Sequence, residues 1–161
     1  MCKINVWFLA LVLLTGSMAQ AQEKDYNGGE NALGIRAGGT TGITFKKFFN
    51  KKTGLELIGG YNFDNDIKNV SMTALFEKHA PLIGDRFAAF IGAGPSYVFS
   101  GSNFGASATL GFDMRLGKTP LNFQIDWMPS YYFTNGSHFS PDNGGLSIRY
   151  ILNHKKLYQK E

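Results

Sequence analysis

The stretch F-G-A-S-A-T-L-G-F-D-M-R-L, residues 104–116, alternates strictly between two kinds of side chain. One set is apolar: Phe104, Ala106, Ala108, Leu110, Phe112, Met114 and Leu116. The other set is small or charged: Gly105, Ser107, Thr109, Gly111, Asp113 and Arg115. Successive side chains of a β-strand point to opposite faces, so this period of two predicts a strand with one apolar and one polar face.

The same alternation recurs along the chain, in eight runs separated by turn-forming segments rich in Gly, Asn, Asp and Pro. The runs cover residues 32–40, 41–48, 54–64, 69–79, 86–99, 104–116, 121–133 and 144–152. The longest connection is 134–143, and the connection 80–85 holds Pro81. We find no helical periodicity in this region. The pattern predicts an all-β fold of eight antiparallel strands in up-and-down order, within one domain.

The polar face carries charges that cancel. Its members are Arg36, Lys46, Arg115 and Arg149, with Glu56, Glu77, Asp113 and Asp126. Many of the residues between them are Gly, Ser or Thr. Small residues leave room for a few long side chains inside a narrow eight-stranded barrel, and a balanced set of buried charges can pair there. The polar face is therefore expected to line the interior, as a network of paired charges or, alternatively, as a path for protons or small ions.

The apolar face is then expected to lie outside. Aromatic residues gather near the ends of the runs, as they do at the two interfaces of a membrane. They are Phe45, Phe48, Phe49, Tyr61, Phe63, Tyr97, Phe99, Phe104, Trp127, Tyr131, Tyr132, Phe133 and Tyr150. Tilted strands of about 10 residues cross a bilayer. These features favour a transmembrane β-barrel over a soluble lipocalin-like ligand-binding barrel, in which the apolar face would point inward.

The first residues predict export. Lys3 precedes an apolar run at 6–14, and Ala19 and Ala21 form the small-x-small pattern that signal peptidase reads. We expect a signal peptide at 1–21, a short N-terminal segment at 22–31, the barrel at 32–152 and a frayed polar tail at 153–161. The only cysteine, Cys2, would leave with the signal, so the mature chain could form no disulfide or thiolate metal site.

Little in the chain points to catalysis or to nucleic acid. Removal of Lys3 lowers the formal net charge of +4 by one, and the remaining surplus is scattered. His79 lies beside Glu77, which permits a general-base interpretation, but a polar residue at the rim of the barrel is favoured. His138 lies near Ser137, Ser140 and Asp142, where a solvated loop is favoured over a catalytic triad. We therefore expect no catalytic residue, no cofactor and no metal.

Several short motifs resemble those of small outer-membrane β-barrels of the OmpX/OmpA type. They are Gly34-Ile35-Arg36, Gly42-Ile43-Thr44-Phe45-Lys46, Glu77-Lys78-His79, Gly92-Ala93-Gly94, Asp126-Trp127-x-Pro129 and Leu146-Ser147-Ile148-Arg149-Tyr150. Asn143, Gly145, Ile148 and Tyr150 also resemble the last-strand signal of such barrels, although eleven residues follow Tyr150.

The resemblance implies a monomeric barrel in the outer membrane of a Gram-negative bacterium. Its partners would be outer-membrane lipid and lipopolysaccharide, periplasmic chaperones and the barrel-assembly machinery. It implies a non-enzymatic role, structural or through surface loops, with a lipid A-modifying enzyme as the alternative.

Overall fold

The computed structural model describes residues 28–62, 69–84, 86–99, 102–116, 119–134 and 137–154. The predicted signal peptide, with Ala19 and Ala21, lies outside the described residues, as does most of the predicted tail. The strands are β1 (Asn31–Gly38), β2 (Thr40–Asn50), β3 (Thr53–Asn62), β4 (Asn69–Ile83), β5 (Phe87–Val98), β6 (Asn103–Leu116), β7 (Leu121–Trp127), β8 (Ser130–Tyr132), β9 (His138–Ser140) and β10 (Gly144–Ile151). Among these residues, no helix is long and apolar enough to cross a membrane.

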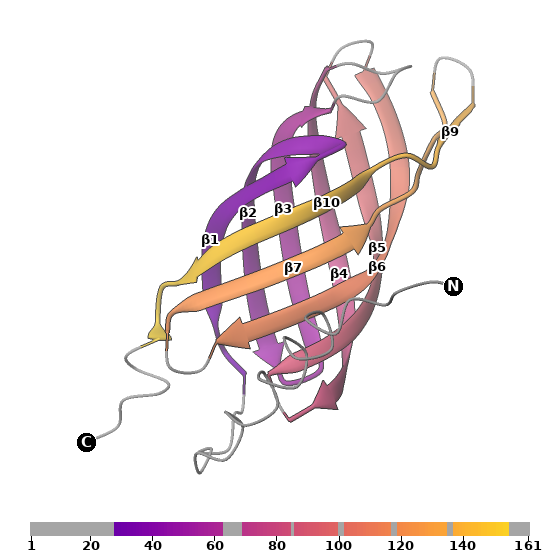
Figure 1. Cartoon of the computed structure of the whole chain (residues 1–161). Helices are drawn as coiled ribbons and strands as arrows, with labels where there is room; N and C mark the ends of the chain where they lie inside the picture. Colours follow the sequence, from indigo (N-terminus) through magenta and orange to yellow (C-terminus); the bar gives the residue numbers. More distant parts are fainter. Residues whose placement is uncertain are drawn as a thin grey trace, which may run out of the picture.

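The strands close into an antiparallel barrel of eight strand positions (Figure 1). Neighbours along the chain pair from β1 to β7, and β10 pairs with both β7 and β1 to close the ring. The predicted all-β, up-and-down, eight-stranded architecture is confirmed. We call the end where β1 begins and β10 ends the basal end, and the opposite end the distal end.

The seventh and eighth positions are each interrupted near the distal end. β8 continues the line of β7 along β6, and β9 pairs with β8 beyond the start of β10. The break in the seventh position falls at Met128 and Pro129, where proline cannot donate to a ladder. Part of the predicted 134–143 loop is therefore strand β9.

The fourth strand is longer than its alternation predicts. β4 continues past His79 to Ile83 and pairs with β5 through Pro81, with a register shift between Pro81 and Ile83. Proline is tolerated where a bulge interrupts the ladder, so its presence does not end a strand there. The predicted connection 80–85 was wrong, and only three residues separate β4 from β5.

The two faces of the barrel wall differ as the alternation predicts. The outward side chains are large and apolar, and Ile35 and Ile91 are each 66% exposed. The inward side chains are mostly polar and buried, with one small apolar cluster of Ile58, Leu75 and Met128. This distribution is the reverse of an ordinary globular fold, in which the apolar residues lie inside.

Two aromatic residues assigned to the outer rim lie inside instead. Phe48 is 1% exposed and Tyr132 is 3% exposed. Each occupies an inward position in the alternation of its own strand, between outward neighbours such as Phe49 and Tyr131. The period of two therefore predicts the face of an aromatic residue better than its nearness to a strand end.

The segments that flank the barrel in the chain are held at the basal end. Asn153, the first residue of the predicted frayed tail, donates to the carbonyl of Gly29 at 2.7 Å and accepts from the backbone N–H of Asn31 at 2.9 Å. Glu30, in the predicted N-terminal segment, is fully buried. These contacts tie the residue after β10 to the residues around the start of β1.

Candidate functional site

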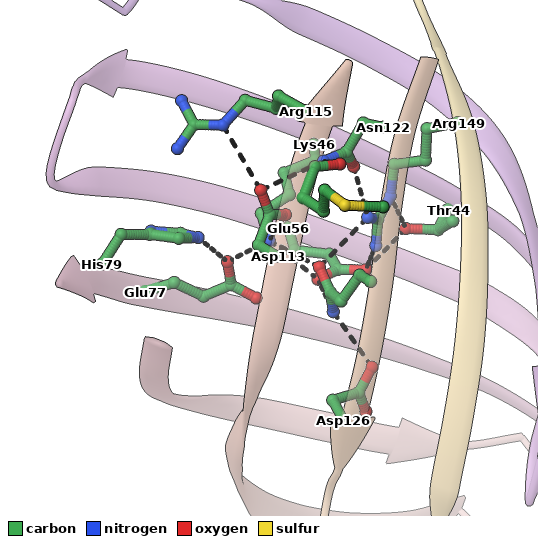
Figure 2. Close-up of polar contacts among 12 residues, drawn as sticks. Thr44, Lys46, Glu56, Glu77, His79, Asp113, Arg115, Asn122, Asp126 and Arg149 are labelled. Carbon is green, nitrogen blue, oxygen red and sulfur yellow. Dashed lines mark hydrogen bonds and ion pairs between the residues drawn. The ribbon is translucent and has the colours of Figure 1, made fainter. Parts of the chain in front are cut away.

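The most distinctive feature of the molecule is a network of charged side chains inside the barrel (Figure 2). All eight predicted interior residues are buried there, and Glu30 joins them as a ninth charge. The charge network consists of Arg36, Lys46, Arg115 and Arg149, with Glu30, Glu56, Glu77, Asp113 and Asp126. The inward positions of seven barrel strands and the residue preceding β1 supply these groups, because alternate residues of every strand face the interior.

Glu56 and Arg149 form the centre of the network. Arg149 on β10 pairs with Glu56 on β3 through Nη2, and its Nε donates to Thr44 Oγ1 at 3.0 Å. Thr44 in turn donates to Glu56 Oε1 at 2.6 Å. Charge-assisted hydrogen bonds of this kind satisfy the buried carboxylate from two directions.

Lys46 connects this centre to two further carboxylates. Its Nζ lies 2.6 Å from Glu77 Oε2, 3.2 Å from Asp113 Oδ2 and 3.8 Å from Glu56 Oε2. The ammonium also lies 4.6 Å from the ring centroid of Phe90. One cation thus offsets several buried anions, which would otherwise repel one another.

Arg36 and Asp126 form a separate bidentate pair nearer the distal end. The two guanidinium nitrogens donate to the two carboxylate oxygens at 2.6 and 2.7 Å. The pair joins β1 to β7 across β10, over a sequence separation of 90 residues. Gly145 on β10 lies directly beneath the guanidinium, where any side chain would collide with it. The absence of a side chain at this position makes room for the pair.

Two uncharged residues link these pairs and were not identified as site residues from the sequence. Gln124 donates to both Glu56 and Asp126 at 3.0 Å, and its carbonyl accepts from Lys46 at 2.6 Å. Asn122 donates to Asp113 at 3.0 Å and accepts from Arg149 at 2.9 Å. Both are inward residues of β7, so the alternation indicates their face; only the fold identifies their partners.

Glu30 was also missed, because it precedes the first predicted strand. Its carboxylate lies 3.5 Å from Arg115, which is 3.4 Å from Asp113 on its other side. The guanidinium of Arg115 stacks over the ring of Phe48 at 4.6 Å. Phe48 therefore belongs to the interior site, as the apolar support of a buried cation.

His79 lies toward the basal end of the barrel, where its side chain is buried. Its ring lies 5.3 Å from Phe90 and 5.2 Å from Phe48, between centroids. Its Nε2 lies 3.5 Å from Glu77 Oε2, but neither ring nitrogen has a hydrogen-bond partner among the described residues. His79 and Glu77 do meet, as their spacing allows, at an enclosed position.

A second polar region, without charge, lies toward the distal end. Thr73, Ser96, Ser107 and Ser130 form a line of hydroxyl contacts across β4, β5, β6 and β8, with oxygen–oxygen distances of 3.0, 2.5 and 2.6 Å. We call these four residues the hydroxyl ladder. Each hydroxyl can donate once and accept twice, so the line can satisfy itself without charge.

The predicted loop histidine lies away from the charge network. His138 is half-buried on β9, where it and the buried Ser140 share the inner side, whereas Asp142 is exposed. In the antiparallel pairing of β8 with β9, Ser130 lies opposite Ser140 and Tyr132 lies opposite His138. Within the described ranges, no group of three or more His, Cys, Asp or Glu residues is arranged to hold a metal ion.

In the described interior, each charged side chain of the network is paired with a side chain of opposite charge. Every charge in the network lies within 4 Å of an opposite charge. Such an arrangement stabilises one geometry of the wall, because removal of either partner leaves the other buried and unpaired. Comparisons with protein-family models, curated proteins and solved structures found no match for this chain.

Proposed function

We propose that this chain is an integral outer-membrane β-barrel, exported through its signal peptide and embedded with its apolar wall in lipid. The observation that carries the proposal is the reversed distribution of side chains. Outward residues such as Ile35, Ile43 and Ile125 are 58–66% exposed, while whole ion pairs are buried. In water this arrangement would expose far more contiguous apolar surface than soluble monomers carry. In a bilayer the same apolar surface would contact the acyl chains of the lipid.

The ends of the wall support the same proposal. Outward aromatic residues gather at the distal end, where Tyr97 and Phe99 are in edge contact at 5.1 Å and Tyr131 and Phe133 at 5.3 Å between centroids. Aromatic rings of this kind favour the headgroup level of a membrane. The continuous strands also suit the length needed: β5 has 12 residues and β6 has 14, and about 9 to 11 tilted residues cross the hydrocarbon core.

We further propose a non-enzymatic role, structural or through the distal loops, like that of the OmpX/OmpA-type barrels it resembles, and a monomeric state. The interior supports this role, because its closely paired charges behave as a fixed plug rather than as a binding site. A lipocalin-like barrel needs an apolar interior for its ligand, and the interior here is ionic. Lipid, lipopolysaccharide and the assembly machinery are the corresponding partners.

The test is to express the full-length gene in a Gram-negative host, isolate outer membranes and compare boiled with unboiled samples on a denaturing gel. We expect the protein in this fraction, with an unboiled band that migrates faster because the closed barrel resists detergent. Recovery as a water-soluble periplasmic protein with no heat shift would overturn the membrane proposal. Lipid A from the same membranes should have an unchanged mass spectrum; a new acylation or deacylation product would instead support the enzymatic alternative.

A further inference from the structure

The lysine and arginine residues outside the charge network are distributed unevenly along the barrel. Among the residues that the structure describes, all of them lie at the basal end: Lys47, Lys51, Lys52, Lys78 and Arg86. The one acidic residue outside the network in the same ranges is Asp142, which lies at the distal end. The part of the outer surface formed by the described residues therefore has a positive basal end, although the interior is close to neutral.

Three of these residues form a compact cluster on neighbouring strands. We call Lys47, Lys52 and Lys78 the basal lysine cluster; all three are exposed. Lys78 on β4 lies opposite Thr53 on β3, and Lys47 on β2 lies opposite Leu55, two residues further along β3. With strands ~4.8 Å apart and a rise of ~3.4 Å per residue, the Cα atoms of Lys47 and Lys78 are about 12 Å apart. The carbonyl of Lys52 accepts from the N–H of His79 at 2.7 Å, which places Lys52 beside Lys78.

Among the residues that the structure describes, the cluster has no anionic partner. None of its three ammonium groups forms an ion pair with a carboxylate of the described residues; the contact of Lys47 is with the ring of Phe49, 5.8 Å from its centroid. By contrast, the neighbouring Lys46 faces inward and is paired with carboxylates. Three neighbouring cations without a counter-charge repel one another, and an external anion would relieve that repulsion.

The cluster also adjoins the apolar wall. Leu55 and Phe76 face outward in the row next to Lys78, and Phe49, which lies beside Lys47, is 52% exposed. Lysine can lay its apolar stem along such a surface and place its ammonium at the boundary with water. A ligand that matches both features has an anionic head and an apolar tail.

From these observations we infer that the basal lysine cluster binds the phosphodiester headgroup of an anionic phospholipid, with the acyl chains of that lipid lying against the wall beside β2, β3 and β4. The inference rests on the proposed membrane location. In that location the basal end of an even-stranded barrel faces the periplasm, so the lipid belongs to the inner leaflet.

The experiment uses the full mature chain, refolded into nanodiscs of equal parts phosphatidylglycerol and phosphatidylcholine with identical acyl chains. Native mass spectrometry then counts the lipids that leave the disc bound to the barrel. Each cation that contacts an anionic surface contributes roughly a fivefold preference. We therefore expect the wild-type protein to retain phosphatidylglycerol over phosphatidylcholine at least fivefold.

Two matched variants identify the source of the preference. The triple change Lys47→Gln, Lys52→Gln and Lys78→Gln should remove it, whereas the charge-conserving change of the same three residues to Arg should keep it. The heat shift of each variant shows that its barrel is folded. Equal retention of the two lipids by the wild type, or an undiminished preference in the Gln variant, would overturn the inference and leave the membrane proposal standing.

Two further outcomes separate this inference from its alternatives. If added lipopolysaccharide displaces phosphatidylglycerol and is retained by the same lysines, the cluster recognises the phosphates of that lipid, and the inner-leaflet assignment is wrong. If the protein does not enter nanodiscs of either composition, the membrane proposal fails and this inference fails with it.

Discussion

The charge network and the hydroxyl ladder fill the same barrel by different means. In the network, long side chains cross the bore, as when Lys46 on β2 reaches Asp113 on β6. In the ladder, short side chains on adjacent strands touch their neighbours, from Thr73 on β4 to Ser130 on β8. The first ties opposite parts of the wall together with buried charges, whereas the second adds short neutral contacts along it. The cost of losing one member should therefore differ strongly between the two regions.

The largest effect should come from removing the cation shared by three carboxylates. Changing Lys46→Met keeps an unbranched apolar stem but leaves Glu77, Asp113 and Glu56 without their common partner. The breaking of a buried pair by loss of one partner costs about 3–5 kcal/mol. We expect a loss of this size in the free energy of unfolding, measured by urea titration of the heat-shifted band in detergent.

Lys47→Met is the matched control for that change. It makes the same substitution on the same strand one residue later, where the side chain is exposed and faces outward. Surface changes usually alter stability by less than about 0.5 kcal/mol. If the two variants lost equal free energy of unfolding, the interior position of Lys46 would not explain its effect. The inward and outward faces of β2 would then contribute equally to stability.

A smaller effect should follow from breaking the ladder. Ser107 contacts Ser96 at 2.5 Å and Ser130 at 2.6 Å, so Ser107→Ala removes the middle of the line. The loss of neutral hydrogen bonds that leaves buried partners unsatisfied costs about 1–3 kcal/mol. In the same urea titration, Ser107→Ala should be less destabilised than Lys46→Met.

Thr109→Val provides the control within the same strand. Thr109 is buried on the same inward face of β6, but its hydroxyl has no hydrogen-bond partner in the described part of the chain. Removal of an unsatisfied hydroxyl without much change in shape should be neutral or stabilising. A loss at Thr109 as large as that at Ser107 would mean that volume, and not the ladder, determines stability there.

The sequence predicts the faces of the wall far better than the partners across it. The alternation of side chains along each strand predicts that Arg36, Lys46 and Glu56 face inward, without reference to any other strand. Which inward residues meet depends on the stagger between strands around the ring, and the alternation carries no information about that. Gln124 illustrates the limit, because its face follows from the pattern and its four charged neighbours do not.

Three of the wrong predictions have a common cause. Phe48 and Tyr132 were assigned to the outer rim by their aromatic character, against the alternation of their own strands. The turn preference of proline predicts that the strand ends before Pro81, but the bulge that accommodates Pro81 is visible only in the pairing of β4 with β5. Glu30 was missed because it lies outside the alternating run. For Phe48, Tyr132 and Pro81, a general preference of the residue type was outweighed by the position of the residue in the closed sheet.

The smallest effect should come from the distal hairpin, outside both regions. Deleting residues 135–139 removes most of β9 but spares Ser140, which is buried, and Asn143, whose amide donates to Thr40 Oγ1 at 2.9 Å and whose carbonyl oxygen accepts from the N–H of Thr40 at 3.0 Å. Loop tips tolerate such changes when little buried backbone is lost. We expect the heat shift to persist, with a change in unfolding free energy within about 0.5 kcal/mol. A barrel that no longer folds would show that β9 is part of the structural wall, and the surface-loop role would then have to move to another connection. A barrel that folds normally would leave this hairpin available for contacts beyond the membrane, because the strand pairing from β1 to β7 and β10 closes the wall without β9.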